Sequence, residues 1–283
     1  MDHSGSLFLS RDIPFKKIFS KYIFRIVTAF LFWSFVYAAK YYFDYGDIIK
    51  TLEHFIAGHY HLWFLFMITG VYLIIPFMKK ISESEFLTKY FLILAFAFTF
   101  CLSQSVNLVS VLSEKYGTLA QGIFYSFYLN FVMGFTGYFL LGYVLNRIEI
   151  SDKAARLIYF AGILGFIATI LMSVMASYIK NKPNEIFYDA NTINVLLESV
   201  AVFVFFKRNF SKHSRIILAL SKYSFGAYLI HDIFIQIIKD CGINTLSFNP
   251  IFSVPVISIM VFVLSFLSSG ILNQIPILKK YLL

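Results

Sequence analysis

The feature that most constrains this chain is a series of long windows that contain almost no charged side chain. About 20 apolar residues in a helix cross the roughly 30 Å hydrocarbon core of a bilayer. Only 14% of the residues are charged and 59% are hydrophobic, whereas soluble domains average about 25% charged residues. We therefore predict an all-α fold, a polytopic membrane helical bundle. Eight spans are expected, at about 22–39, 61–78, 89–110, 124–145, 157–177, 191–206, 223–241 and 253–275.

Lysines and arginines lie mainly in the connections between these spans, and their density alternates along the chain. The segment before the first span and those after the second, fourth, sixth and eighth are the richer ones. By the positive-inside rule, both termini are predicted to be cytoplasmic in a multi-pass protein of the cell membrane. The net charge of +9 is then a topological signal, and nucleic acid is not an expected partner.

The remaining chain organisation indicates one integral-membrane domain over residues 1–283, with no repeat or soluble domain. Cys101 and Cys241 show no metal-ligand spacing, so neither a disulfide framework nor a zinc site is supported. The N-terminal residues lack an apolar region followed by a cleavage site, so no secretory signal is expected. Residues 48–56 have one apolar face, which predicts a short helix on the outer membrane surface.

Ionisable groups inside the spans are the candidate functional residues, because burying one in hydrocarbon costs about 2.5–3.5 kcal/mol on insertion scales. They are Arg25, His61, Glu198 and His231, with Asp232 beside the last.

Two of these groups are histidines with aromatic or hydroxyl neighbours. Ser224 and Tyr228 precede His231 by seven and three residues, which places the three on one helical face that could line a cavity; packing between helices is the alternative. His61 begins a span next to Trp63, which could instead serve as an interface anchor. His59 and His61 are two residues apart, a spacing that does not share a helical face, so no metal site is expected.

Glu198 and Gln104 are polar residues in otherwise apolar spans. Glu198 is either neutral and hydrogen-bonded or paired with a histidine or arginine across the bundle, and a raised pKa would suit a general acid or base. Gln104 either hydrogen-bonds a polar ligand or joins helices.

Two stretches resemble a known family. "YHLWFLFMITGVYLIIP" (Tyr60 to Pro76) and "LSKYSFGAYLIHDIFI" (Leu220 to Ile235) are similar to the paired signatures of the membrane-bound acyltransferase family 3, in the same order and at similar separation. "SGSLFLSRDIPFKKIFSKYIFRI" near the N-terminus resembles the end of that family's second membrane helix, its basic loop and the start of its third. The resemblance covers essentially the whole chain.

The resemblance implies a bundle of ten membrane helices that transfers an acyl group, usually acetyl, from cytoplasmic acetyl-CoA to a hydroxyl of a surface polysaccharide or its lipid-linked precursor. It implies catalytic roles for His61, His231 and Glu198, with His61 orienting an acceptor or a partner group rather than serving as the sole base. It also implies donor binding by Arg25 and Lys21. The residues expected to bind the acceptor glycan are Trp63, Ser224, Tyr228 and Gln104.

The chain departs from the family pattern in two ways. It begins where the third family helix is expected, so the family's presumed catalytic histidine has no counterpart and a fragment of this kind is predicted to be inactive. Tyr22 and Arg25 occupy the positions of the family's Arg-x-x-Arg at the donor site, so only the second arginine of that motif is present. Two other functions stay open: a degenerate, non-catalytic membrane partner, and a glycan flippase or transporter, for which no inverted repeat is seen.

Overall fold

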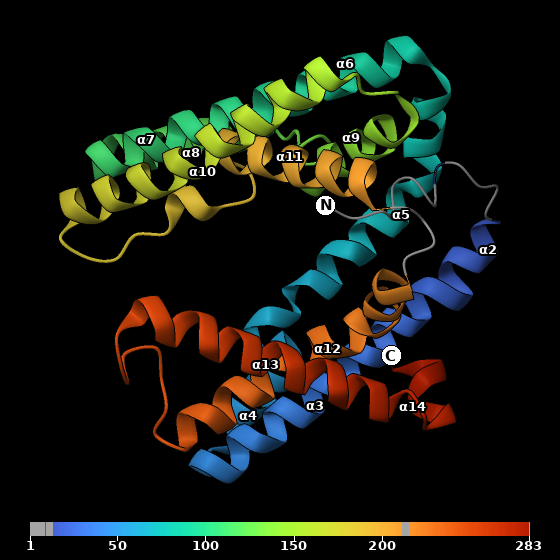
Figure 1. Cartoon of the computed structure of the whole chain (residues 1–283), viewed down its shortest axis with the longest axis vertical. Coiled ribbons are helices and arrows are strands. Elements are labelled where there is room, and N and C mark those ends of the chain that lie inside the picture. Colours follow the sequence, from blue (N-terminus) through green and yellow to red (C-terminus); the bar gives the residue numbers. More distant parts are fainter. Residues whose placement is uncertain (1–8, 10–13, 211–214, 283) are drawn as a thin grey trace. The chain divides into compact units, whose positions relative to one another are not determined.

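The computed structural model describes Leu9 and residues 14–210 and 215–282. The chain divides into two compact units (Figure 1). The first contains residues 1–13 and 73–211, and the second contains residues 14–72 and 212–283. Both are helical, and the prediction of one membrane domain over residues 1–283 stays a prediction. The basic residues Arg11 and Lys212 lie outside the described residues, as do residues 4–8 and 10–13 of the N-terminal stretch that resembles the family.

Unit 2 begins with one long helix in three parts and ends with a pair of packed helices. Tyr37 of the first helix donates its hydroxyl to the Leu229 carbonyl at 2.8 Å, and Ser269 donates to the Tyr223 carbonyl at 2.8 Å. Its elements are α2 (Phe15–Lys17), the π-helical turn η1 (Ile18–Ile23), α3 (Phe24–Tyr45), α4 (Ile48–Ala57), the 3₁₀ turn η2 (Tyr60–Leu62), the first part of α5 (Trp63–Glu83), α12 (Arg215–Asp240), α13 (Pro250–Leu272) and α14 (Pro276–Tyr281).

Unit 1 is built around the long helices α10 and α11, which pack closely because small residues face the partner helix. A Cβ on Gly162 would lie 2.3 Å from that of Ala201, and one on Gly165 would lie 2.6 Å from the Asn194 carbonyl oxygen. Its elements are the rest of α5, α6 (Glu85–Ala95), the π-helical turn η3 (Phe96–Leu102), α7 (Ser103–Leu112), α8 (Glu114–Tyr125), α9 (Phe135–Arg147), α10 (Asp152–Lys180), the 3₁₀ turn η4 (Ile186–Tyr188) and α11 (Ile193–Asn209).

The structure confirms a polytopic helical bundle, with no strand among the described residues. In the same part of the chain, six helices are long and apolar enough to cross a membrane: 15–45, 48–83, 85–112, 152–180, 186–209 and 250–272. The expected span 223–241 lies within α12, which is long enough but carries histidine, aspartate, glutamine and lysine in its second half. These polar residues lower its hydropathy.

The expected span 124–145 is interrupted, which the apolar window did not reveal. Helix α8 ends at Tyr125 and α9 starts at Phe135, and the connection between them contains Tyr128 and Gly134 with positive φ. Helix α9 has 13 residues, about 20 Å of helix, which is shorter than a bilayer core. Hydropathy averages over such a break because the connection itself is apolar and aromatic.

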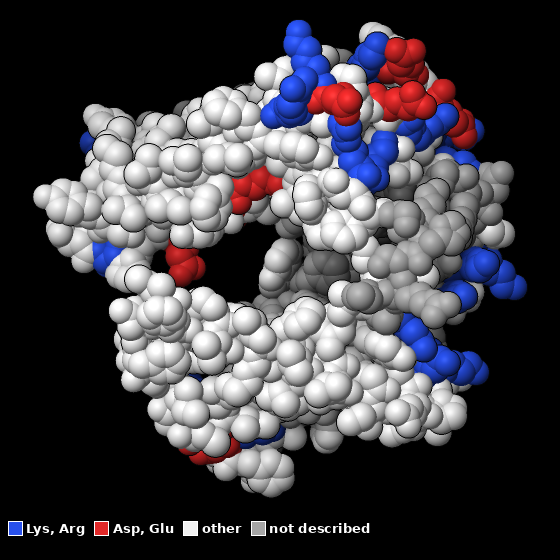
Figure 2. All heavy atoms as spheres, in the orientation of Figure 1, with Lys and Arg blue, Asp and Glu red and all other residues white. Residues whose placement is uncertain are grey.

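The surface has the composition expected for contact with lipid. Most atoms on the face shown in Figure 2 belong to uncharged residues, and charged groups gather at a few places. The predicted amphipathic helix at residues 48–56 is confirmed as α4, with Asp47 accepting hydrogen bonds from the backbone N–H groups of Ile49 and Lys50. Its apolar side chains Ile49 and Ile56 are exposed, as a helix on a membrane surface requires.

Candidate functional site: a buried histidine and aspartate cluster

A short non-helical segment brings two histidines into unit 2. Helix α4 ends at Ala57, and the next residue, Gly58, has a φ of 76° and a ψ of 162°, which are open to glycine but costly for other residues. A Cβ at this position would lie 2.6 Å from the Phe30 ring of α3, so the segment runs directly against that helix. His59 is extended, with φ of −67° and ψ of 149°. The helical spacing argument used for His59 and His61 was therefore wrong, because His59 lies before the helix.

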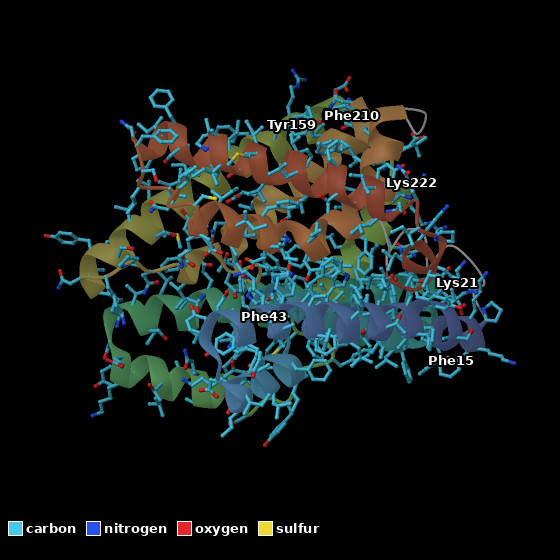
Figure 3. All side chains as sticks on the ribbon, turned by 90° about the horizontal axis from the view of Figure 1, so that it is seen from below. Phe15, Lys21, Phe43, Tyr159, Phe210 and Lys222 are labelled. Carbon is cyan, nitrogen blue, oxygen red and sulfur yellow. The ribbon has the colours of Figure 1, made fainter. Side chains whose placement is uncertain are left out.

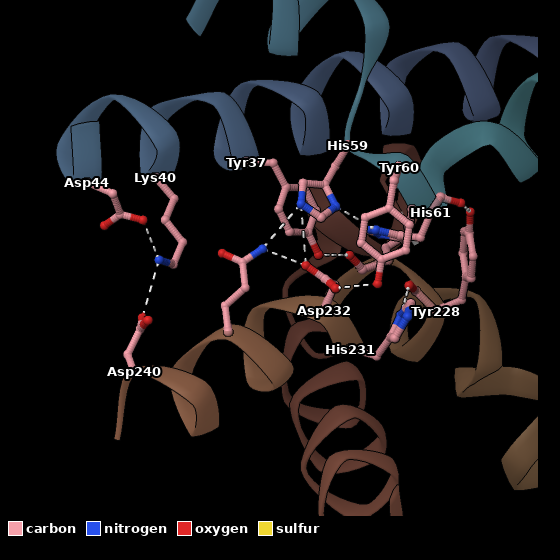
Figure 4. A network of polar contacts seen from close by, with 12 residues as sticks. Tyr37, Lys40, Asp44, His59, Tyr60, His61, Tyr228, His231, Asp232 and Asp240 are labelled. Carbon is pink, nitrogen blue, oxygen red and sulfur yellow. Dashed lines mark hydrogen bonds and ion pairs between the residues drawn. The ribbon is translucent and has the colours of Figure 1, made fainter. Parts of the chain in front are cut away.

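The two imidazoles meet beside α3. His59 Nδ1 lies 3.0 Å from His61 Nδ1, so one nitrogen donates and the other accepts (Figure 4). The Tyr37 ring stacks on His59, with centroids 4.5 Å apart and planes inclined by 24°. Tyr37 also contacts His61 edge-on at 5.0 Å. We call the group formed by Tyr37, His59, Tyr60, His61, Asp232 and Gln236 the histidine–aspartate cluster.

Asp232 of α12 is the buried charge of this cluster, with 2% of its surface exposed. Its Oδ1 accepts from the Tyr60 hydroxyl at 2.7 Å, and its Oδ2 accepts from Gln236 Nε2 at 2.5 Å. His59 Nε2 lies 3.5 Å from the same Oδ2. A buried carboxylate is stable only when donors surround it, so these three side chains hold the charge inside unit 2.

Two proton arrangements satisfy the row of atoms from Asp232 to His61. In one, His59 Nε2–H points to Asp232, His59 Nδ1 accepts from His61 Nδ1–H, and His61 Nε2 keeps its lone pair. In the other, the Gln236 amide donates to His59 Nε2 at 3.3 Å. His59 Nδ1–H then donates to His61 Nδ1, and His61 Nε2 carries a proton. In the first arrangement His59 is a third donor to the Asp232 carboxylate, after Tyr60 and Gln236. A buried carboxylate needs such donors in place of water, so the first arrangement is favoured.

His61 Nε2 is the atom at the end of this row. His61 is 5% exposed, and its Nε2 is buried without a hydrogen-bond partner in the described part of the chain. Buried polar atoms are rarely left this way in folded proteins. With Trp33 Nε1 and Ser34 Oγ, His61 Nε2 is therefore one of the buried atoms of unit 2 that could pair with a polar group of a ligand.

His231 and Tyr228 of α12 lie beside His61, as the sequence predicted for their shared face. The ring centroids of His61 and His231 are 4.9 Å apart. His231 Nδ1 lies 2.6 Å from the Tyr228 carbonyl oxygen, which can only accept, so Nδ1 carries the proton and Nε2 the lone pair. Tyr228 donates its hydroxyl to the His61 carbonyl, which ties the segment after Gly58 to α12.

The cluster also has the composition of a metal site. His59, His61 and Asp232 can each offer one ligand atom, and these atoms lie within 4.8 Å of one another. Two imidazoles and one carboxylate form a recurrent set for divalent transition metals. The hydrogen bonds to Tyr60 and Gln236 already satisfy Asp232 without an ion, and the absence of a metal stays a prediction.

Ser224 and Trp63, expected to bind the acceptor, are positioned differently from the histidines. Ser224 is exposed and donates its hydroxyl to the Ser221 carbonyl of its own helix at 2.9 Å. Trp63 starts α5 with 53% of its surface exposed, a place typical of interface anchors. The geometry favours structural roles for both.

The expected donor-binding residues Arg25 and Lys21 lie at the start of the first long helix of unit 2. Both are exposed, and the Arg25 guanidinium lies 5.4 Å from the centre of the Phe225 ring of α12. Lys21 and Lys222 are found toward the same end of the unit (Figure 3). Arg25 precedes Tyr37 by 12 residues, which is about 18 Å along a helix. The cationic end and the histidine–aspartate cluster are thus separate regions of unit 2.

Glu198 and Gln104 belong to unit 1, and their partners lie within it. Glu198 Oε1 accepts from the Thr169 hydroxyl at 2.5 Å, and Asn194 Nδ2 donates to the same hydroxyl oxygen at 2.6 Å. Gln104 Oε1 accepts from the Ile193 backbone N–H at 3.3 Å. Both residues join helices here, which favours the structural alternative for each.

The sequence analysis named Asp232 only as the neighbour of His231, and it missed Gln236 and Tyr37, which also surround the two histidines. Asp232 and Gln236 are four residues apart on one helix face, a spacing that could have suggested that they interact. Tyr37 lies in another apolar span, and no local pattern singles it out.

Comparison with models of protein families matches residues 4–270 to acyltransferase family 3, a model described as an acyltransferase domain. Comparisons with curated proteins and with solved structures gave no match. The matched range contains the histidine–aspartate cluster, His231 and the cationic end of unit 2.

Proposed function

Because the chain belongs to acyltransferase family 3, we propose that it transfers an acetyl group from cytoplasmic acetyl-CoA to a hydroxyl of a cell-surface polysaccharide or of its lipid-linked precursor. An acyltransferase of this kind needs a base for the acceptor hydroxyl. The observation that supports the proposal is the pair of imidazoles formed by buried His61 and half-buried His231, whose ring centroids are 4.9 Å apart.

In the proposed reaction, the imidazole pair takes the place of the family's presumed catalytic histidine, which was not found in the sequence, so we propose activity where the resemblance alone predicted none. The acceptor hydroxyl hydrogen-bonds to this pair. The Nε2 lone pair of one of these two imidazoles removes the hydroxyl proton while the hydroxyl oxygen attacks the carbonyl carbon of the thioester. The new O–C bond forms, the C–S bond breaks, and the proton passes from the imidazole to the leaving thiolate. Asp232 stabilises positive charge on His61 through His59, in the manner of a carboxylate behind a catalytic histidine.

Donor binding is assigned to the cationic end of unit 2. Arg25 and Lys21 would form charge-assisted hydrogen bonds with the phosphates of CoA. The flexible pantetheine arm would then extend along α3 toward the histidine–aspartate cluster. The Arg25 guanidinium lies 5.4 Å from the centre of the Phe225 ring, a cation–π contact that helps to hold the guanidinium at this end of unit 2 and favours this assignment.

The proposed membrane orientation follows from the distribution of basic residues. Both termini of the chain face the cytoplasm in the cell membrane, so Arg25 faces the compartment that supplies acetyl-CoA. The histidine–aspartate cluster then lies in the outer half of the bilayer, where a surface glycan or its lipid-linked precursor would be presented.

Membranes that contain the full chain, incubated with acetyl-labelled acetyl-CoA, test the proposal through label in the extracted glycan. His61→Ala and His231→Ala are each expected to lower labelling by about 10²- to 10⁴-fold, the usual contribution of a general base. His54→Ala is the matched control, because His54 is an exposed histidine of α4. Absence of label with the unaltered chain would refute the acetyltransferase and favour a non-catalytic partner, whereas movement of glycan without label would favour a flippase.

A further inference from the structure

Unit 1 contains a polar cavity that the proposed chemistry does not use. Its volume is about 650 Å³, within the usual range of small-molecule sites. Its walls come from η3, α7, α8, the connection between α8 and α9, and the segment around η4. The connection between α8 and α9, which interrupts the expected span 124–145, forms one wall of this cavity.

Four side-chain amides contribute to the polar lining. Asn107 of α7, Gln121 of α8, Asn130 of the connection and Asn191 before α11 all border the cavity. Each amide offers a donor and an acceptor side by side, as does a pair of neighbouring sugar hydroxyls. Asn191 Oδ1 is buried and accepts no hydrogen bond from the described residues, so it is an acceptor available to a ligand.

Aromatic rings complete the lining. Phe124, Tyr125 and Tyr188 border the same cavity, and both tyrosines are more than half exposed. An aromatic face next to amide groups fits a pyranose, which has an apolar C–H face and a polar hydroxyl edge. A purely apolar ligand would leave the amides unpaired, and a small ion would leave the rings without contact.

The charges of the lining restrict the ligand further. Glu185 and Asp189 border the cavity, and none of its lining residues is lysine, arginine or histidine. Two carboxylates without a cation repel phosphates, sulfates and uronic acids at contact distance. CoA is excluded as an occupant for the same reason.

We propose that this cavity binds a carbohydrate chain that is uncharged or carries amino groups, and that it discriminates against acidic glycans. The binding follows from the chemistry of the cavity alone, whereas the identification of the bound chain as the acetyl acceptor rests on the proposed function.

A glycan array that contains neutral, amino-sugar and acidic oligosaccharides tests the proposal with the full chain in detergent. The unaltered protein is expected to retain neutral or amino-sugar glycans at least tenfold better than acidic ones. Asn191→Leu and Tyr188→Ala are each expected to lower this retention at least tenfold. Tyr178→Ala is the matched control, since Tyr178 is an exposed tyrosine of α10 outside the cavity lining.

A charge reversal separates ligand recognition from a structural role. The double variant Glu185→Lys and Asp189→Lys is expected to shift the preference toward acidic glycans, which loss of folding would not do. Retention of no glycan by the unaltered chain, equal retention of acidic and neutral glycans, or a double variant with unchanged preference would overturn the proposal. Labelled acetyl transfer without glycan retention would reject carbohydrate binding in this cavity and leave the proposed function standing. Glycan retention without acetyl transfer would support binding in the cavity and reject the proposed function.

Discussion

Gly58 controls the position of both cluster histidines, and its replacement by alanine is the sharpest test of the site geometry. A backbone with φ of 76° and ψ of 162° costs a residue other than glycine about 1–3 kcal/mol. The new Cβ would also lie 2.6 Å from the Phe30 ring and 3.3 Å from Ser34 Oγ. Overpacking of this kind costs about 1–3 kcal/mol, at the low end if the Phe30 ring can turn away.

The two contributions together predict that Gly58→Ala lowers the free energy of unfolding by about 2–4 kcal/mol. At about 2–4 °C for each kcal/mol in a chain of this size, the melting temperature falls by roughly 4–16 °C. Labelled acetyl transfer should fall as well, because His59 and His61 directly follow the displaced residue.

Gly70→Ala is the matched control in the same unit. Gly70 lies within α5, and a Cβ there meets nothing within 4 Å. Alanine in a helix is favoured over glycine by about 1 kcal/mol, so this variant should melt no lower than the original chain. Equal melting temperatures for Gly58→Ala and Gly70→Ala, measured by thermal unfolding in detergent, would refute the role given to Gly58.

Three further predictions concern the cluster and the donor end. Tyr60→Phe removes one donor to buried Asp232 and should lower stability by about 1.5–3 kcal/mol, whereas Tyr45→Phe at an exposed position should not; equal thermal melting of the two variants would contradict this. Elemental analysis of the purified chain should find well under one equivalent of any transition metal, and a stoichiometric ion would identify the cluster as a metal site instead. Arg25→Ala should raise the KM for acetyl-CoA about tenfold with little change in kcat, since a charge-assisted hydrogen bond contributes about 1.5–3 kcal/mol. Lys115→Ala is the control, and a changed kcat with unchanged KM would show that Arg25 does not bind the donor.

The helical membrane fold was predictable from the sequence because lipid permits few backbone solutions. A chain with several uncharged windows must satisfy its backbone groups within each segment, and helices do so. The same reasoning identified α4 from one apolar face. It also placed Tyr228 and His231 on one face from their spacing, whereas Ser224, predicted for the same face, is exposed. These inferences needed only the helical period.

Features that depend on contacts between distant segments could not be predicted. The connection between α8 and α9 is as apolar as a span, so hydropathy did not show that the helix breaks there. The contact between His59 and His61 depends on the extended backbone after Gly58. The carboxylate behind this pair comes from Asp232, which is 173 positions from His59 in the sequence. Glu198 looked like an isolated charge until the fold placed the Thr169 hydroxyl 2.5 Å away.

The sequence by itself determined that the chain forms membrane helices and which family it resembles, because composition and local period act within one segment. Only the tertiary structure decided which polar groups share an environment. A buried hydrogen bond is set by the packing of two helices whose spacing in the sequence carries no signal. The contacts of Tyr37 with His59 and of Tyr60 with Asp232 arose for that reason, and Glu198 and Gln104 acquired partners in unit 1.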